Sequence, residues 1–221
     1  MVSHEVRTPL ASVLGFTRLL LERDLPEEDR RRYLGIVDAE ATRLAALVSD
    51  FLDARLIEEG RFSLRREPFD LRSLVREQAE VTLGHDENHE LELELPDEPL
   101  QIDGDRARLA QVVGNVLSNA VKYSPEGGTI TVGAAEDQGH ARVWIADEGT
   151  GIPPEHRGQL FQPFYRGDAA AAGIPGTGLG LAVSRRIVEA HEGRIGFDPL
   201  DRGTCFWFDL PLEAAAANGR R

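Results

Sequence analysis

The sequence has little cysteine and a deficit of basic residues. Its single cysteine, Cys205, excludes an intramolecular disulfide, and we expect it to be buried in a strand. Lysine and arginine total 25 against 38 aspartates and glutamates, so the formal net charge is -13. Such a chain is poorly suited to neutralise nucleic-acid phosphates or anionic lipids. We therefore expect a small-molecule or protein partner, no nucleic acid and no direct membrane contact.

Long apolar runs are also missing. No stretch is long enough to span a bilayer, and residues 1–25 lack the basic and apolar segments of a secretory signal. These absences lead us to expect a soluble, cytoplasmic chain. With 221 residues, the chain has room for one sizeable domain and a smaller one.

Two stretches near the start carry apolar residues at alternating steps of three and four. The second is interrupted once, at Glu40, and a turn with Pro26 separates the two. This spacing predicts a helical hairpin in which each helix buries one stripe. A hairpin of this size covers its apolar surface better with a second copy, so we expect a homodimer with a four-helix bundle. The stripe residues are Val6, Leu10, Val13, Thr17 and Leu20, then Tyr33, Val37, Leu44, Leu47, Phe51 and Ala54.

The pattern changes after residue 60. Residues 62–70 have the composition of an extended linker, so we expect domains at 1–66 and 67–212 and a disordered tail at 213–221. Strands with helices between them predict an α+β fold, a two-layer α/β sandwich with a mixed sheet. The acidic residues 86–94 are expected to form a solvated edge. The expected helices are 71–82, 105–122 and 178–191, and the expected strands are 91–95, 129–135, 141–146, 194–198 and 205–211.

The helix expected at 105–122 has a distinctive polar side. Gln111, Asn115, Asn119 and Lys122 recur at steps of four, four and three, apart from its apolar face. Asparagine is a poor helix former, so two of them in mid-helix need a reason beyond propensity. An amide oxygen can ligate Mg2+, and a lysine one turn further on can meet a polyphosphate. A solvated helix face would show the same row.

Two glycine-rich segments follow this helix. Asp147-Glu148-Gly149-Thr150-Gly151 comes after a strand, where a carboxylate can accept the exocyclic amine of adenine and glycines let backbone approach the ring. An ordinary turn has a similar composition. The run from Gly176 to Leu181 opens a helix, whose free amides and dipole favour phosphate. The spacing fits neither a dinucleotide-binding fold nor a P-loop.

In order along the chain, these segments resemble the motifs of the ATP-binding domain shared by histidine kinases, gyrase-type topoisomerases, MutL and heat-shock chaperone ATPases. The histidine kinases are the best match. Residues 115–123 resemble their N box, 147–151 their first glycine box and 161–166 their F box. Residues 201–204 match the third glycine box only in part, because an aspartate replaces its first glycine. The resemblance implies ATP and Mg2+ as cofactors and a mobile lid at 167–175.

The resemblance also implies roles for individual residues. Asn119 would ligate Mg2+ with help from Asn115, and Lys122 would contact phosphates, as would Arg166. The hydrolytic relatives carry a glutamate at the position of Asn115, and asparagine cannot act as a base toward water, so phosphoryl transfer is favoured over hydrolysis. Tyr123 would lie against the nucleotide and Asp147 would bind adenine. The other nucleotide-binding positions are Gly149, Gly151, Gly176, Thr177, Gly178, Leu179 and Gly180.

Near the start, His4-Glu5-x-x-Thr8-Pro9-Leu10 resembles the H box of histidine kinases. A neutral imidazole nitrogen of His4 can attack the γ-phosphorus of ATP, and Glu5 can take the proton of the other ring nitrogen. Thr8 shares a helix face with His4, and the family implies that Glu5 and Thr8 also orient a water that removes phosphate from a partner's aspartate. Pro9 should weaken or bend this helix. The other histidines, expected to be structural or solvated, are His85, His89, His140, His156 and His191.

As a whole, the resemblance implies a homodimeric sensor histidine kinase core. It would phosphorylate His4 with ATP and pass the phosphoryl group to an aspartate on a response-regulator receiver domain, with phosphatase activity as the reverse function. Only three residues precede His4, fewer than in the family, so we expect a fragment of a longer sensor, which the inner membrane can anchor. Two alternatives stay open: a module that binds nucleotide and regulator without autokinase activity, and an anti-sigma-type serine kinase, which lacks the hairpin and the H box.

Overall fold

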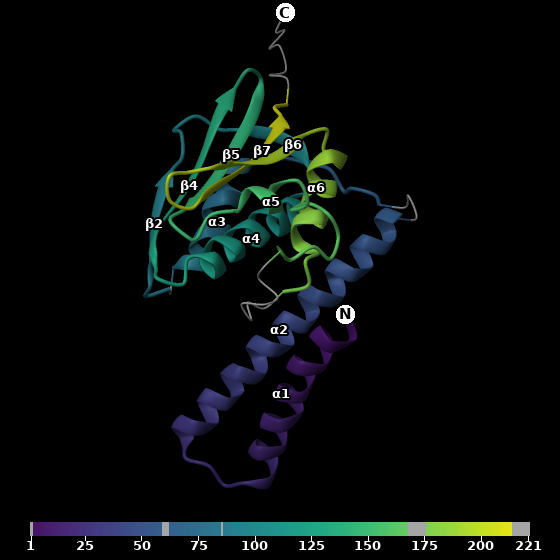
Figure 1. Ribbon diagram of the computed structural model, residues 1–221, viewed down its shortest axis with the longest axis vertical. Helices are drawn as coiled ribbons and strands as arrows, with labels where there is room; N and C mark the ends of the chain where they lie inside the picture. Colours follow the sequence, from purple (N-terminus) through teal and green to yellow (C-terminus); the bar gives the residue numbers. More distant parts are fainter. Residues whose placement is uncertain (1, 59–61, 85, 168–175, 214–221) are drawn as a thin grey trace, which may run out of the picture. The chain divides into compact units, whose positions relative to one another are not determined.

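The computed structural model describes residues 2–58, 62–84, 86–167 and 176–213 (Figure 1). Some side chains of the first two helices lie outside the described part, namely those of residues 2–5, 43, 46, 50, 54, 57 and 58. The chain divides into two compact units. One contains residues 1–62 and 164–179, and the other contains residues 63–163 and 180–221.

The first unit contains the helical hairpin that the heptad pattern predicts. Its helices are α1 (Val2–Glu22) and α2 (Glu27–Glu58). The rings of Phe16 and Tyr33 lie 5.2 Å apart and join the two helices. α1 continues through Pro9, so this proline lies inside the helix and does not end it. In the part of the chain that the structure describes, every helix is too short or too polar to cross a membrane.

A five-stranded mixed sheet forms the basis of the second unit, with the strand order β2-β4-β5-β7-β6. β2 and β4 are parallel, and the other neighbours are antiparallel. The mixed sheet expected from the sequence is therefore confirmed, and β2 lies at its edge, as the acidic residues suggested. The strands are β2 (His89–Glu94), β4 (Gly128–Asp137), β5 (His140–Asp147), β6 (Arg194–Pro199) and β7 (Thr204–Pro211).

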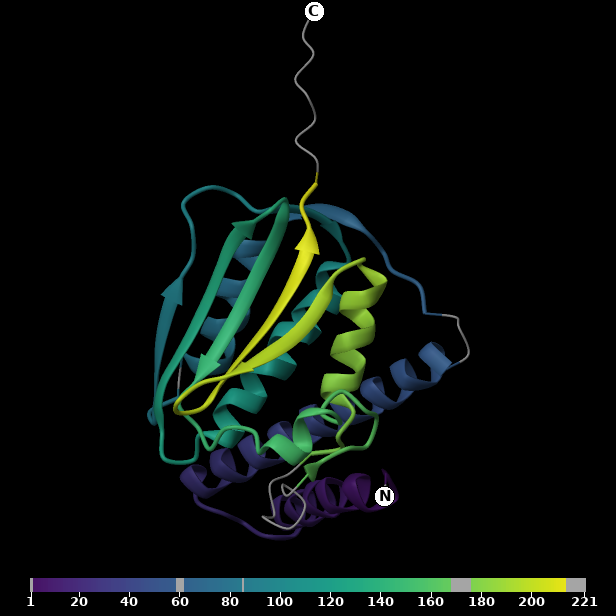
Figure 2. The same cartoon turned by 45° about the horizontal axis from the view of Figure 1, so that its top comes forward.

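Three helices cover one face of this sheet (Figure 2). Alternation along β5 directs Ala141, Val143 and Ile145 toward the helices, and all three are buried. The core therefore lies between the sheet and the helices, which is the two-layer sandwich expected. The helices are α3 (Leu71–Leu83), α4 (Arg106–Tyr123) and α6 (Gly180–Ala190), and a short α5 (Pro154–Arg157) was not anticipated.

The opposite, open face of the sheet carries Trp144 on β5 and Trp207 on β7, which are partners in register. Each indole lies across a glycine of the neighbouring strand. A Cβ atom on Gly133 would come within 2.1 Å of the Trp144 ring, and one on Gly196 within 2.6 Å of the Trp207 ring. Both positions therefore require glycine. Cys205 also belongs to β7 but is only partly buried, which corrects the expectation of a buried cysteine.

Two short strands were missing from the sequence prediction. They are β1 (Glu67–Asp70) and β3 (Gln101–Gly104), which pair antiparallel. The expected linker thus ends in a strand, and four residues are too few for a period of two to stand out. Just before β1, the backbone amide of Arg65 donates to Oδ2 of Asp105 at 2.9 Å. This bond ties the linker to the start of α4.

His191 joins the end of α6 to the start of α4. Its Nε2 accepts a hydrogen bond from the amide of Asp105 at 2.9 Å, and its Nδ1 lies 2.7 Å from the carbonyl oxygen of Ile187. A neutral ring with its proton on Nδ1 satisfies both bonds. Burial lowers the pKa of His191, and the bond to Ile187 only partly opposes this. This histidine is structural, as expected from the sequence.

Acidification should therefore destabilise the second unit. The pKa of His191 is lower in the folded state, so the unfolded chain binds the proton first. The contribution of neutral His191 to the free energy of unfolding is complete well above about pH 6.5. At lower pH it falls by up to about 1.4 kcal/mol per pH unit. Denaturant unfolding followed by the fluorescence of Trp144 and Trp207 reports on this unit. His191→Gln should flatten this part of the pH profile. An unchanged profile in His191→Gln would contradict the structural role of this histidine.

Candidate nucleotide and phosphotransfer site

α4 presents the polar row that the sequence predicted. Asp105 caps the helix by accepting a hydrogen bond from the amide of Arg108 at 3.2 Å. Asn115 and Asn119 are half-buried and lie one turn apart, and Lys122 is exposed in the last turn. The buried residues of α4 are all apolar and do not include any of these three residues. The helix thus offers two amides and one ammonium outside the core.

The first turn of α6 holds one of these amides. Nδ2 of Asn115 donates to the carbonyl oxygen of Gly180 and to Oγ of Ser184, both at 3.3 Å. A Cβ atom on Gly180 would lie 3.4 Å from Cγ of Asn115, so the two helices are already in contact at this point. Sequence reasoning did not single out Ser184. The sequence did contain a signal for it, because Ser184 is a polar residue within the apolar stripe of the helix expected at 178–191.

Asp147 lies at the end of β5, and it is only 5% exposed. Its Oδ1 accepts a hydrogen bond from the amide of Gly149 at 2.9 Å, and the amide of Thr204 also bonds to the carboxylate. Burial raises the pKa of Asp147, and these two amides oppose the shift because they favour the ionised form. The site therefore contains a desolvated carboxylate that backbone amides orient.

The loop after Asp147 is fastened to the end of α4. The amide of Thr150 donates to the carbonyl oxygen of Tyr123 at 3.0 Å. A Cβ atom on Gly149 would come within 2.2 Å of the same oxygen, so only glycine allows this approach. The residues assigned to the N box and the first glycine box are therefore neighbours, and they bring Asp147 and the end of α4 to one end of the sheet.

Gly203 is a further residue that the sequence reasoning left out of the site. It has a φ of +84°, and a Cβ atom there would come within 1.8 Å of the carbonyl oxygen of Asp147. It belongs to the segment that matched the third glycine box only in part. This segment retains Gly203, and any larger residue at that position would clash with the backbone of Asp147.

Five of the positions predicted to bind nucleotide belong to the first unit: Arg166, Gly176, Thr177, Gly178 and Leu179. Within that unit, the amide of Phe164 donates to the carbonyl oxygen of Gly178 at 2.9 Å. Gly178 has a φ of +72°, and a Cβ atom there would come within 2.6 Å of the carbonyl oxygen of Tyr165. The two ends of residues 164–178 are therefore held together. Residues 168–175 of the expected lid lie outside the described residues.

The H box lies in α1. The backbone of His4 and Glu5 is helical, and their side chains lie outside the described residues. Thr8 is exposed and lies one turn after His4, on the same helix face. The helix therefore supplies the spacing that the H box requires.

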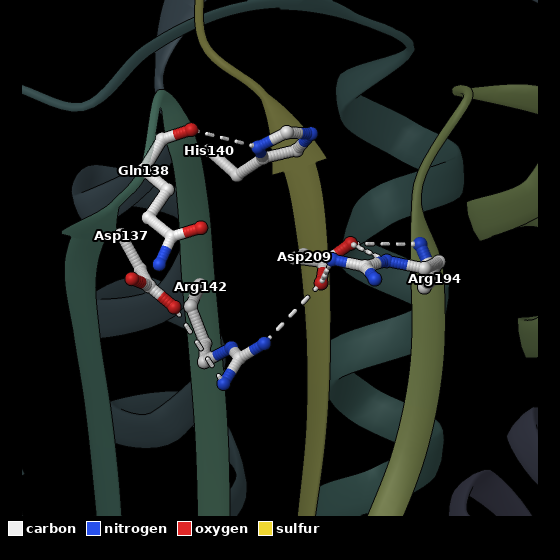
Figure 3. A pocket seen from close by; sticks show the side chains of 6 residues that line it. All are labelled: Asp137, Gln138, His140, Arg142, Arg194 and Asp209. Carbon is white, nitrogen blue, oxygen red and sulfur yellow. Dashed lines mark hydrogen bonds and ion pairs between the residues drawn. The ribbon is translucent and has the colours of Figure 1, made fainter.

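A hollow at the opposite end of the open sheet face has a structural role (Figure 3). It lies beside the turn between β4 and β5, at the start of β5, whereas Asp147 lies at the other end of that strand. The buried carboxylate of Asp209 accepts hydrogen bonds from Arg194 at 2.9 Å and from Arg142 at 3.4 Å. The Arg142 guanidinium also lies 4.7 Å from the centre of the Trp207 ring. Because these groups pair with one another, the cluster ties β5, β7 and β6 together.

Comparisons with known proteins agree with this geometry. Residues 104–214 match the family of histidine kinase-, DNA gyrase B- and HSP90-like ATPases, and residues 1–60 match the His Kinase A (phospho-acceptor) domain. The sensor protein GacS of Pseudomonas syringae pv. syringae is 37% identical over 225 residues, which cover 97% of this chain and 24% of GacS. The chain thus spans about a quarter of the length of that curated relative.

Solved structures give the same result. The structure of full-length ShkA in complex with AMPPNP has a TM-score of 0.71 and 34% identity, covering 97% of this chain and 45% of ShkA. The complex of histidine kinase ThkA with the response regulator protein TrrA has a TM-score of 0.64 and 28% identity, covering 96% of this chain and 60% of ThkA. This chain therefore belongs to the sensor histidine kinases and contains their catalytic core, a phospho-acceptor helical hairpin followed by an ATPase-type domain.

Proposed function

We propose that this chain uses ATP to phosphorylate His4 and passes the phosphoryl group to an aspartate on a response-regulator receiver domain. The observation that carries the proposal is that one chain combines a phospho-acceptor hairpin with a domain whose buried Asp147, paired amides and glycine turns suit a nucleotide. The similarity to a histidine kinase solved with its response regulator supports a receiver domain as partner. The similarity to a kinase solved with AMPPNP supports ATP as the nucleotide.

In this proposal, Asp147 accepts the exocyclic amine of adenine, because two backbone amides already orient its carboxylate. Tyr123 packs against the nucleotide, and Lys122 contacts phosphate oxygens, as does Arg166. Free backbone amides at the first turn of α6 favour the phosphates. The glycine-rich positions that complete the nucleotide site are Gly149, Gly151, Gly176, Thr177, Gly178, Leu179 and Gly180.

Asn119 and Asn115 fit a Mg2+ ion. Amide oxygens are hard donors of the kind Mg2+ prefers, and the nitrogen of Asn115 is already turned toward α6. When bound, Mg2+ neutralises negative charge on the ATP phosphates. Neither amide can act as a base toward water, so this pair favours phosphoryl transfer to a side chain over hydrolysis.

Phosphoryl transfer from ATP to His4 is a simple displacement at the γ-phosphorus. A neutral ring nitrogen of His4 attacks the γ-phosphorus while the bond from that phosphorus to the bridging oxygen breaks, and ADP leaves with the electron pair. Glu5 accepts the proton of the other ring nitrogen. In the second step, a receiver carboxylate attacks the phosphorus, the phosphorus–nitrogen bond breaks with its electron pair on the ring nitrogen, and Glu5 returns the proton, so that the imidazole is neutral again. Glu5 and Thr8 can also orient a water for the phosphatase reaction.

A homodimer is part of the proposal. Several large apolar side chains of the hairpin are exposed in the single chain, and Leu21 is 80% exposed. A second hairpin would cover such a surface in a four-helix bundle. We further propose a dimerisation and phosphotransfer domain at 1–66 and a catalytic domain at 67–212. We also propose that the chain acts in the cytoplasm, as part of a longer protein that a membrane can anchor. The other exposed apolar residues are Leu10, Leu14, Leu34, Val48, Phe51 and Leu52.

Incubation of the chain with γ-labelled ATP and Mg2+ tests the proposed function. The expected result is label on the protein that is acid-labile and base-stable, as for phosphohistidine, and that moves to an added receiver domain. Nucleotide binding without label would instead indicate a binding module without autokinase activity. Acid-stable label would indicate a serine kinase of the anti-sigma type.

A further inference from the structure

Ser184 is a buried hydroxyl that none of the proposed steps uses. Its side chain is fully buried on α6. A hydroxyl buried without a hydrogen bond is costly, so such a group should have a partner. The partner is on α4, where Nδ2 of Asn115 donates to Oγ of Ser184 at 3.3 Å. The surrounding buried residues of α6 are all apolar: Ala182, Val183, Ile187 and Val188.

The bond to Ser184 is one of two that fix the same amide. Nδ2 of Asn115 also donates to the carbonyl oxygen of Gly180, again at 3.3 Å. An asparagine amide has two donor hydrogens on its nitrogen and acceptor lone pairs on its oxygen. Nδ2 lies within hydrogen-bond distance of two acceptors on α6, which fixes the side of the amide that carries the hydrogens. An amide turned by 180° would instead bring its oxygen close to the carbonyl oxygen of Gly180, which is unfavourable.

We infer that Ser184 is a positioning residue that keeps the oxygen of Asn115 directed toward the Mg2+ of bound ATP, beside Asn119. This inference rests on the proposed function. The carbonyl oxygen of Gly180 only accepts, so it selects the orientation with Nδ2 toward it, and the Ser184 hydroxyl holds the side chain in that place. Without the hydroxyl, one of the two bonds to Nδ2 is lost and the Asn115 side chain is held less firmly. A displaced amide no longer presents its oxygen to the cation. Ser184 therefore acts only through Asn115.

The affinity for ATP, measured with Mg2+ and again with EDTA, isolates this effect. The ratio of the two affinities reports the contribution of Mg2+. For Ser184→Ala, we expect this ratio to fall roughly three- to tenfold, the effect of one neutral hydrogen bond, while the affinity in EDTA stays unchanged. In an Asn115→Ala background, Ser184→Ala should cause no further change in the ratio, because the two residues act as one unit.

Val183→Ala is the matched control, because it removes buried volume from the same helix without touching a hydroxyl. It should lower the denaturant midpoint followed by tryptophan fluorescence and leave the ratio at the parent value. A parent-like ratio in Ser184→Ala would overturn the inference and leave the proposed function standing. A ratio lowered equally by Val183→Ala would reduce Ser184 to a packing role and also overturn it. A parent chain whose ATP binding does not respond to Mg2+ would overturn the proposed function and this inference with it.

Discussion

Replacing His4 with glutamine should remove all acid-labile label from the chain while leaving its ATP affinity unchanged. Glutamine preserves hydrogen bonding and roughly preserves size, but its amide nitrogen has no available lone pair to attack phosphorus. His4 lies on α1, whereas the proposed adenine and Mg2+ contacts come from α4 and β5, so nucleotide binding should not depend on it. The measurement is autoradiography after incubation with γ-labelled ATP and Mg2+, paired with calorimetric titration of ATP.

A second histidine variant separates this effect from any general effect of losing an imidazole. His140 lies at the start of β5, beside the turn that follows β4, and its ring contacts the carbonyl oxygen of Gln138 in that turn. His140→Gln should be labelled as fast as the parent. Residual acid-labile label on His4→Gln would show that another histidine accepts the phosphoryl group. That result would remove the H box from the mechanism.

Replacing Asp147 with asparagine should weaken ATP binding by about 30-fold, the loss of one hydrogen bond to a charged acceptor. The carboxylate has two oxygens, so it can accept bonds from the Gly149 amide and from adenine together. An amide has one oxygen, and the backbone amide of Gly149 holds it. Its nitrogen would then meet the adenine amine as donor against donor. The preference for ATP over GTP should also fall, because guanine presents an oxygen at that position.

The same substitution should not weaken the fold. Burial raises the pKa of Asp147, so at neutral pH folding has to bury an ionised carboxylate. A raised carboxyl pKa adds stability only as the pH falls toward the folded-state pKa, and it opposes folding above it. At pH 7 the unfolding free energy of Asp147→Asn should therefore equal or exceed that of the parent, and the difference should shrink in acid.

Titration of ATP and GTP, with tryptophan-monitored unfolding at pH 7 and pH 5, checks both statements for Asp147. Asp137→Asn is the matched control, because this carboxylate ends β4 near the structural cluster of Arg142 and is exposed. It should leave nucleotide affinity at the parent value. An ATP affinity in Asp147→Asn equal to that of the parent would remove Asp147 from the adenine site.

The periodic elements of this protein could be predicted because their pattern is local. The heptad seam predicted both helices of the hairpin, and every strand of the five-stranded sheet was anticipated to within two residues at each end. β1 and β3 were missed because their hydrogen bonds are made to each other across about thirty residues of chain. The partial exposure of Cys205 was missed because an apolar run does not show which face of a strand meets the core.

Candidate site residues were recognisable where their chemistry is unusual for their position. Two asparagines in mid-helix and an aspartate at a strand end gave such signals. Ser184 and Gly203 did not, because a serine in a helix and a glycine in a turn are ordinary until their neighbours are known. Their importance depends on the 3.3 Å contact with Asn115 and on the close approach to the carbonyl oxygen of Asp147.

The sequence by itself determined the helical hairpin, the strands of the mixed sheet and the family of the chain, because periodicity and motif order are properties of neighbouring residues. Tertiary structure alone decided which way the Asn115 amide turns, how strongly Asp147 is desolvated and why Gly203 has to be glycine. These properties depend on atoms that are far apart in the chain and become neighbours only when α4, α6, β5 and β7 pack together. Orientation and burial are set by that packing, and no local pattern encodes them.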